Sequence, residues 1–173
     1  MRASSLLFAV LAGGAGVAVA AAALAQSMAM PTRKPGFWDQ TMTMETGRGM
    51  TMKSQFCTDA SVEKKMSVLG QNMAGSSCRQ TSMRKTATGF AFDSTCSMAG
   101  RTTTSSGVVS GDFQNGYRID TVSKSSPPLK GTSGESKMHI EAKWLGPCPA
   151  GRKPGDMVMP GGMVMNISTM GAR

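Results

Sequence analysis

Apolar and polar residues alternate along most of the chain, and this period of two predicts β-strands. In residues 38–44, Trp38, Met42 and Met44 fall on one face, and aspartate and threonine residues fall on the other. After the Gly47–Gly49 turn, the alternation resumes in residues 50–56. The pattern therefore predicts a hairpin at the start of the folded domain.

Five more segments have strand character. The last of them is the clearest, because Met138, Ile140, Ala142 and Trp144 point one way and charged residues point the other. The predicted strands cover residues 78–86, 90–96, 101–110, 117–124 and 138–144. Short strands joined by tight turns predict an all-β domain, an antiparallel meander that forms either a curved sheet or a small barrel.

One segment has a helical period instead. Val62, Met66 and Leu69 recur at the spacing of a helix face in residues 59–69. Asp59 is a suitable N-cap, and Gly70 is a suitable stop. We expect this short helix to cover one end or one face of the sheet.

The two ends of the chain differ from this domain. Residues 1–25 combine Arg2, an apolar Ala-rich run and the A-x-A site that ends at Ala25, which predicts a signal peptide cleaved after Ala25 and a periplasmic location. A membrane anchor is the alternative, but alanine and glycine are weakly apolar. Residues 26–34 are interpreted as a linker, 35–148 as the β-rich domain and 149–173 as a Gly/Pro/Met-rich tail.

Four cysteines, all beyond the predicted cleavage site, indicate two disulfides in an exported protein. Zinc is disfavoured because the spacings are wider than those of zinc sites. Cys78 and Cys96 flank one turn symmetrically, and a meander places Cys96 and Cys148 at opposite edges. The preferred pairs are therefore Cys78–Cys96 and Cys57–Cys148, although spacing alone leaves other connectivities open.

The formal net charge is +9, and the basic residues are scattered. A solvated surface explains this better than an anionic polymer or lipid headgroups as a partner. Export argues against nucleic acid as a partner. We expect no membrane-spanning segment once the signal peptide is removed.

Four features occur in order along the chain. They are the Pro35–Trp38 segment (PGFW), a strand that ends at Cys57, the hairpin flanked by Cys78 and Cys96, and the Trp144–Cys148 segment (WLGPC). Together they resemble an exported bacterial family, domain of unknown function 3617, over residues 35–148. The resemblance implies a small β-rich domain with paired cysteines, and it implies no activity and no catalytic residues.

Catalytic chemistry is hard to assemble from these residues. His139 is the only histidine, and it lies on the predicted outward face of a strand. A hydrolase would need a nucleophile and an orienting acid beside it, and the sequence singles out neither. We therefore predict a non-enzymatic binding protein, and an unrecognised hydrolase is a distant alternative.

Two kinds of ligand fit a binding protein. Trp38 and Trp144 are candidates to line a site for a hydrophobic ligand, and an envelope protein is another possible partner. The alternative rests on 17 methionines, many in M-x-M pairs, because thioethers suit Cu(I). The tail methionines Met157, Met159, Met163 and Met165 are the candidate ligands. We otherwise expect no cofactor.

Overall fold

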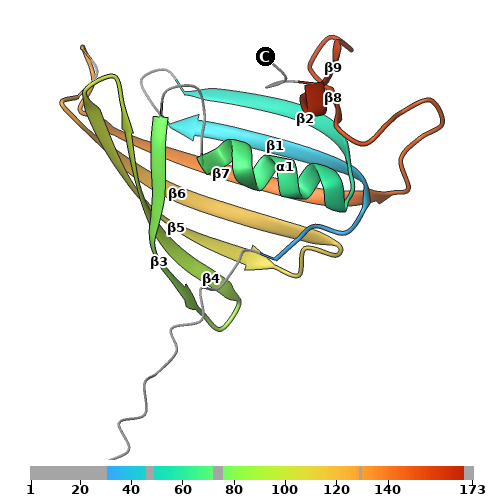
Figure 1. Ribbon diagram of the computed structural model, residues 1–173, viewed down its shortest axis with the longest axis horizontal. Helices are drawn as coiled ribbons and strands as arrows, with labels where there is room; N and C mark the ends of the chain where they lie inside the picture. The colour runs from blue at the N-terminus through green and yellow to red at the C-terminus, as the bar shows by residue number, and fades with distance from the viewer. Residues whose placement is uncertain (1–30, 46–48, 72–75, 129, 170–173) are drawn as a thin grey trace, which may run out of the picture.

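A computed structural model describes residues 31–45, 49–71, 76–128 and 130–169, so the predicted signal peptide lies outside the described residues. The described chain forms one antiparallel sheet with a helix in front of it (Figure 1). Its elements are β1 (Gly36–Glu45), β2 (Met50–Thr58), α1 (Ala60–Gln71), β3 (Ser76–Lys85), β4 (Gly89–Met98), β5 (Arg101–Gly111), β6 (Gly116–Ser126), β7 (Glu135–Gly146), β8 (Asp156–Val158), β9 (Val164–Asn166) and the 3-10 helix η1 (Ile167–Thr169).

The strand order is β3-β4-β5-β6-β7-β1-β2-β8-β9. The segment from β3 to β7 is an up-and-down meander, and β7 then pairs with β1 from the opening hairpin. Trp38 faces Trp144 in that pairing, and Met44 faces Met138. Because β3 and β9 do not pair with each other, the sheet is curved and open, which is the first of the two predicted architectures.

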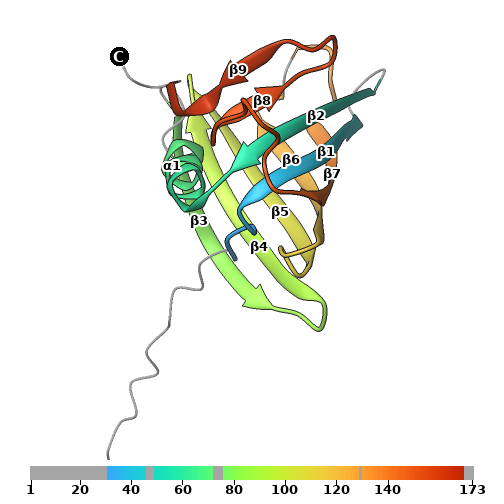
Figure 2. The ribbon, with the colours of Figure 1, turned by 90° about the vertical axis from the view of Figure 1, so that its right-hand side faces the viewer.

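Helix α1 lies on the concave side of the sheet (Figures 1 and 2), which we call the inner face. The Asp59 carboxylate accepts hydrogen bonds from the backbone N–H groups of Ser61 and Val62, both at 2.9 Å, as expected of an N-cap. The helix continues to Gln71, one residue past the predicted stop at Gly70. Val62 is buried, whereas Met66 is exposed, so the apolar stripe is only partly used for packing.

The core lies on the inner face at one end of the strands. Trp38 and Val109 have no exposed surface, and Phe113 and Tyr117 stack with ring centroids 4.8 Å apart. Phe113 reaches the core from the β5–β6 turn, where it adopts a positive φ of 57°. The preceding Asp112 carboxylate stabilises that turn by accepting backbone N–H groups, which holds its pKa well below the usual range.

Both preferred disulfides are present, Cys57–Cys148 and Cys78–Cys96. The second connects register partners on β3 and β4. The first connects the end of β2 to the chain just after β7, and these two segments lie on either side of β1. Among the described residues, no helix combines the length and the apolar character needed to cross a bilayer.

The segment after Cys148 differs from the predicted tail because it adds β8 and β9 to the sheet. Phe56 on β2 faces Met157 on β8, and Met157 faces Met165 on β9. Each strand is only three residues long and is bounded by proline and glycine, so neither shows an alternating pattern in the sequence. Part of the predicted tail, residues 156–158 and 164–166, therefore extends the sheet.

Candidate functional site

The inner face carries partly exposed apolar side chains, of which Phe92, Ile119 and Ile140 also pack against the core. One transverse row crosses β2, β1, β7, β6, β5 and β4, and a second row beside it is interrupted by Thr121 on β6 and Gly107 on β5. Most of these side chains are half-buried, so they keep contact with solvent. We call the half-buried set the inner apolar surface: Met42, Met44, Met52, Phe90, Phe92, Ile119, Met138 and Ile140.

Polar groups lie next to this surface on the same face of the sheet. Ser105 and Ser123 are register partners whose hydroxyls lie 2.8 Å apart. One step further along the strands, the hydroxyls of Thr103 and Ser125 lie 2.9 Å apart. The inner face therefore changes from an apolar core, through half-exposed apolar rows, to a strip of hydroxyl groups.

Methionine dominates one corner of the inner face. Met42 faces Met52, Met44 faces Met50, and Met138 faces Met44 from the other side. All five side chains are on the inner face, because their strand positions share the parity of the buried Trp38 and Phe56. These five residues form what we call the methionine corner.

A mostly buried ion pair joins α1 to the segment that precedes β1. The Arg33 guanidinium donates to the Glu63 carboxylate from Nε at 2.9 Å and contacts it from a terminal nitrogen at 2.8 Å. The same carboxylate accepts the Thr58 hydroxyl at 2.5 Å, and Arg33 donates to the Tyr117 hydroxyl at 3.2 Å. The guanidinium also lies 4.7 Å from the centre of the Phe56 ring.

Ionisation in this network follows from burial and pairing. Burial alone would lower the pKa of Arg33, but the neighbouring Tyr117 and Glu63 outweigh it, so the pKa is raised and the guanidinium stays charged. Burial raises the pKa of Tyr117, which keeps its hydroxyl neutral and able to donate. The Tyr117 hydroxyl donates to the Gln40 side-chain oxygen at 3.4 Å.

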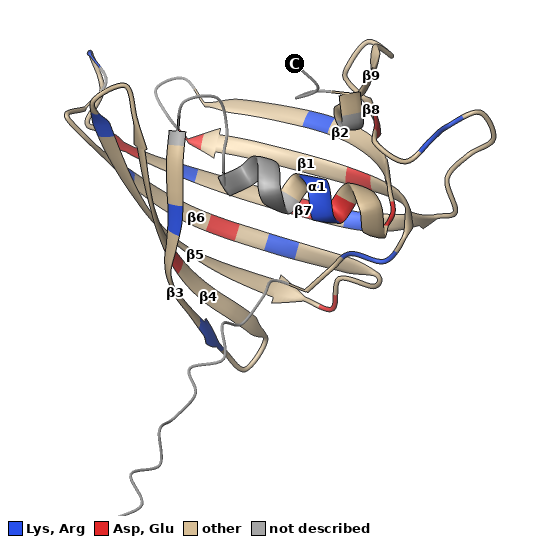
Figure 3. Cartoon of the chain, in the orientation of Figure 1, with Lys and Arg blue, Asp and Glu red and all other residues tan. Residues whose placement is uncertain are grey.

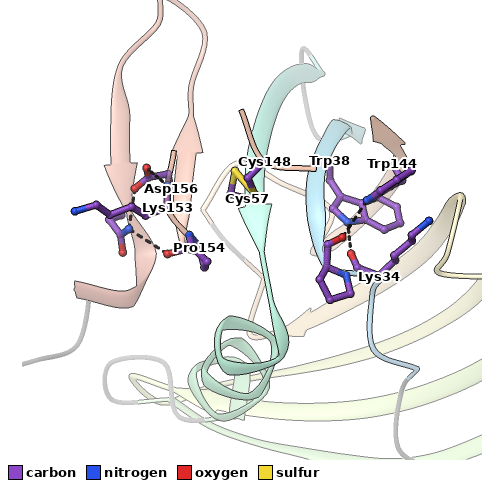
Figure 4. Close-up of a disulfide and its surroundings, with 10 residues drawn as sticks. Lys34, Trp38, Cys57, Trp144, Cys148, Lys153, Pro154 and Asp156 are labelled. Carbon is purple, nitrogen blue, oxygen red and sulfur yellow. Dashed lines mark hydrogen bonds between the residues drawn. A yellow bond between two sulfur atoms is a disulfide. The ribbon is translucent and has the colours of Figure 1, made fainter. Parts of the chain in front are cut away.

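The two tryptophans predicted to line a ligand site occupy different environments (Figure 4). Trp38 is fully buried, and its indole N–H donates to the Lys34 carbonyl at 2.9 Å, so it has no surface available to a ligand. Trp144 is half-buried, with its indole N–H on the Pro35 carbonyl and the Lys34 ammonium 3.6 Å from its ring centre. Of the two, only Trp144 keeps exposed surface.

A family model described as a protein of unknown function, DUF3617, matches residues 33–148. The chain belongs to the DUF3617 family. No curated protein and no solved structure matches it.

The limits of the DUF3617 match coincide with structural features. The match begins at Arg33, the residue that anchors α1, and ends at Cys148, the last cysteine. It therefore covers the ion pair, both disulfides and the strands from β1 to β7. The β8–β9 hairpin lies beyond the matched residues.

The outer face of the DUF3617 domain carries the charged groups. His139 is about one-third exposed there, with Nδ1 2.5 Å from the Asp120 carboxylate and Nε2 3.5 Å from Glu45. Arg118 pairs with both Asp120 and Glu141. Hydrogen bonds from Arg118 and then His139 are the main causes that lower the pKa of Asp120 to about 2. His139 thus belongs to a cross-strand charge network that the sequence pattern did not reveal.

A shallow groove of about 280 Å³ lies beside this network. Its lining includes the apolar Ala91, Val108 and Val122 and the charged Asp93 and Arg84. The Asp93 carboxylate accepts the hydroxyls of two neighbouring serines. Acidic and basic positions are interspersed along the strands (Figure 3), in agreement with the scattered charge of the sequence.

The four tail methionines predicted as metal ligands lie on the β8–β9 hairpin. Met157 packs against the core, and its register partner Met165 is half-buried. The Met159 N–H donates to the Met163 carbonyl at 2.8 Å, and Met163 is largely exposed. Packing against the core therefore explains Met157 without a metal.

Proposed function

We propose that this protein is an exported, non-enzymatic binding protein that holds an apolar or amphipathic small molecule against the inner apolar surface. The observation that carries the proposal is the inner apolar surface, a set of eight apolar side chains that stay partly exposed on the concave side of an open sheet. Apolar side chains of a domain that had no ligand to bind would be expected either deeper in the core or scattered singly over the surface.

The shape of the inner face favours an elongated ligand. Strands lie about 4.8 Å apart, so a row across six strands extends for about 24 Å along the sheet. Each methylene that a ligand buries contributes about 0.8 kcal/mol before the cost of immobilising it. The hydroxyl pairs Ser105–Ser123 and Thr103–Ser125 lie beside the rows and suit a polar headgroup.

The proposed compartment is the periplasm, reached by the predicted signal peptide of residues 1–25. Two disulfides and the lack of any free cysteine in the described chain support an oxidising environment. A native mass of the protein purified from its own host would report cleavage after Ala25, two disulfides and any bound molecule together.

Matched substitutions on the two faces of the sheet test the site. Ile119→Thr and Ile140→Thr each shorten an apolar side chain on the inner face and introduce a hydroxyl, whereas Val108→Thr makes a similar change on the outer face. With a fluorescent fatty acid as the probe, we expect each inner variant to weaken binding by about tenfold, equivalent to about 1.4 kcal/mol. Val108→Thr should bind as the wild type does.

Two outcomes would contradict the proposal. Equal affinities for all three variants would show that the probe does not use the inner face. No binding of the probe, together with a native mass equal to the bare polypeptide, would favour an envelope protein as the partner instead. Thermal denaturation of each variant verifies that a loss of binding does not reflect unfolding.

A further inference from the structure

We propose that the methionine corner is a Cu(I) site, in which the thioether sulfurs of Met44, Met50 and Met138 bind one ion. The fold brings these three residues into one transverse row across β2, β1 and β7, although they are far apart along the chain. Met42 and Met52 form the adjacent row and place two further sulfurs next to it. This inference does not depend on the apolar-ligand proposal.

The register allows the sulfurs to converge. Directly opposed residues on neighbouring strands have Cβ atoms about 5 Å apart. Met44 is opposed to Met50 on one side and to Met138 on the other, so it is the central ligand. A methionine side chain has three rotatable bonds, and its sulfur can therefore move by several ångströms toward a shared ion.

Core packing does not account for methionine at Met50, the most exposed of the five. None of the five side chains in the methionine corner is buried, and Met50 has 59% of its surface exposed. Methionine is useful as a core residue when it fills an irregular buried gap. At a solvent-accessible rim its thioether is instead available to an ion that arrives from solution.

The chemistry of the site selects a soft monovalent ion. Thioethers are neutral and polarisable, and they bind Cu(I) in preference to hard cations. In the described part of the chain, no group of three or more His, Cys, Asp or Glu side chains is placed to hold a metal. Both cysteine pairs are oxidised, so no thiolate in that part competes for the ion.

The test is a competition titration of Cu(I) against bicinchoninate, with ascorbate as the reductant because it leaves disulfides intact. The full-length mature protein is compared with the double variant Met44→Leu/Met138→Leu. Leucine keeps the apolar volume and removes the sulfur. Loss of an outer-shell partner alone typically costs about tenfold or more in metal affinity, so we expect loss of two ligands to weaken Cu(I) binding by at least that factor.

A second variant provides the matched control. Replacing Met157, Met159, Met163 and Met165 together by leucine removes the sulfurs of the β8–β9 hairpin and should leave Cu(I) affinity unchanged. The inference is overturned if this hairpin variant loses Cu(I) while the corner variant keeps it. It is also overturned if the wild type binds no Cu(I) at a one-to-one ratio.

The pH dependence of Cu(I) affinity distinguishes thioether ligands from ligands that carry protons. A thioether carries no proton in this range, whereas histidine and carboxylate ligands must lose a proton to bind a metal. Cu(I) affinity should therefore stay constant from about pH 7 to about pH 5, and a steep decrease would contradict the assignment. Ile119→Thr lies outside the methionine corner and should still bind Cu(I), so the copper proposal can be tested apart from the apolar-ligand proposal.

Discussion

Removing Glu63 should destabilise the domain more than any other single change to a charged group on α1. Glu63→Leu leaves the Arg33 guanidinium without its carboxylate, while both side chains are mostly buried, at 17% and 11% exposure. It also removes the acceptor of the Thr58 hydroxyl. Breaking a buried pair in this way costs about 3–5 kcal/mol, out of a total stability of about 5–15 kcal/mol for a domain of ordinary stability.

The double variant Arg33→Met/Glu63→Leu separates pairing from packing. It removes both charges and keeps most of the apolar volume, and replacement of a buried ion pair by apolar residues is often close to neutral. We therefore expect the double variant to be more stable than Glu63→Leu, with a coupling energy of about 2 kcal/mol or more. Urea unfolding of the wild type, Arg33→Met, Glu63→Leu and the double variant, with both disulfides intact and followed by tryptophan fluorescence, gives the four free energies that the coupling energy requires.

Two results would refute this account of the ion pair. If Glu63→Leu costs less than about 1 kcal/mol, the carboxylate is not holding α1 in the way its contacts imply. If the two single substitutions simply add, Arg33 and Glu63 are not energetically coupled. Glu63→Gln is a useful intermediate, because it removes the charge but keeps an oxygen that can accept the Thr58 hydroxyl.

Three further predictions concern other parts of the fold. Replacing Cys57 and Cys148 by alanine should lower the free energy of unfolding by about 4.5 kcal/mol, because this disulfide closes a loop with a sequence separation of 91. Removing the β3–β4 disulfide, with a separation of 18, should lower it by only about 3 kcal/mol, and urea unfolding measures both. Gly36→Ala should lower the melting temperature and alter tryptophan emission, because φ is +137° and a Cβ atom would lie 2.5 Å from the Trp144 indole nitrogen. Asp120 has its folded pKa lowered to about 2, so it should stabilise the fold above about pH 4 and lose this contribution as the pH falls toward 2. Asp120→Asn should abolish that part of the pH dependence, which amounts to at most about 1 kcal/mol for so exposed a group.

The strands could be predicted because the period-two pattern is strong wherever one face of the sheet is covered. The segment that contains Met138, Ile140 and Trp144 illustrates this, since its apolar residues face inward in β7. The same reasoning gave both disulfides, because a meander restricts which cysteines can meet. The β8–β9 hairpin escaped prediction because three-residue strands between glycines and prolines carry too few positions to show a period.

The candidate site could not be predicted in full, because it depends on which strands pair and in which register, and the alternation of apolar and polar residues does not show this. The pairs Met42/Met44 and Met50/Met52 were visible in the sequence, but the addition of Met138 requires the β1–β7 register. The Arg33–Glu63 pair joins a segment interpreted as a linker to a helix, and no local pattern links them. His139 was correctly placed on the outward face, although its carboxylate partners come from two neighbouring strands.

The position of β1 between β2 and β7 has a consequence for how the chain matures. Among the described strands, β1 is synthesised first, but its β7 partner follows only about 90 residues later. Until then, the backbone N–H and C=O groups along one edge of β1 have no strand to pair with, and they can pair with a wrong strand. Cys57 must likewise wait for Cys148, and oxidation in order of emergence would join it first to Cys78. Recombinant production should therefore gain more from a disulfide isomerase than from a stronger oxidant.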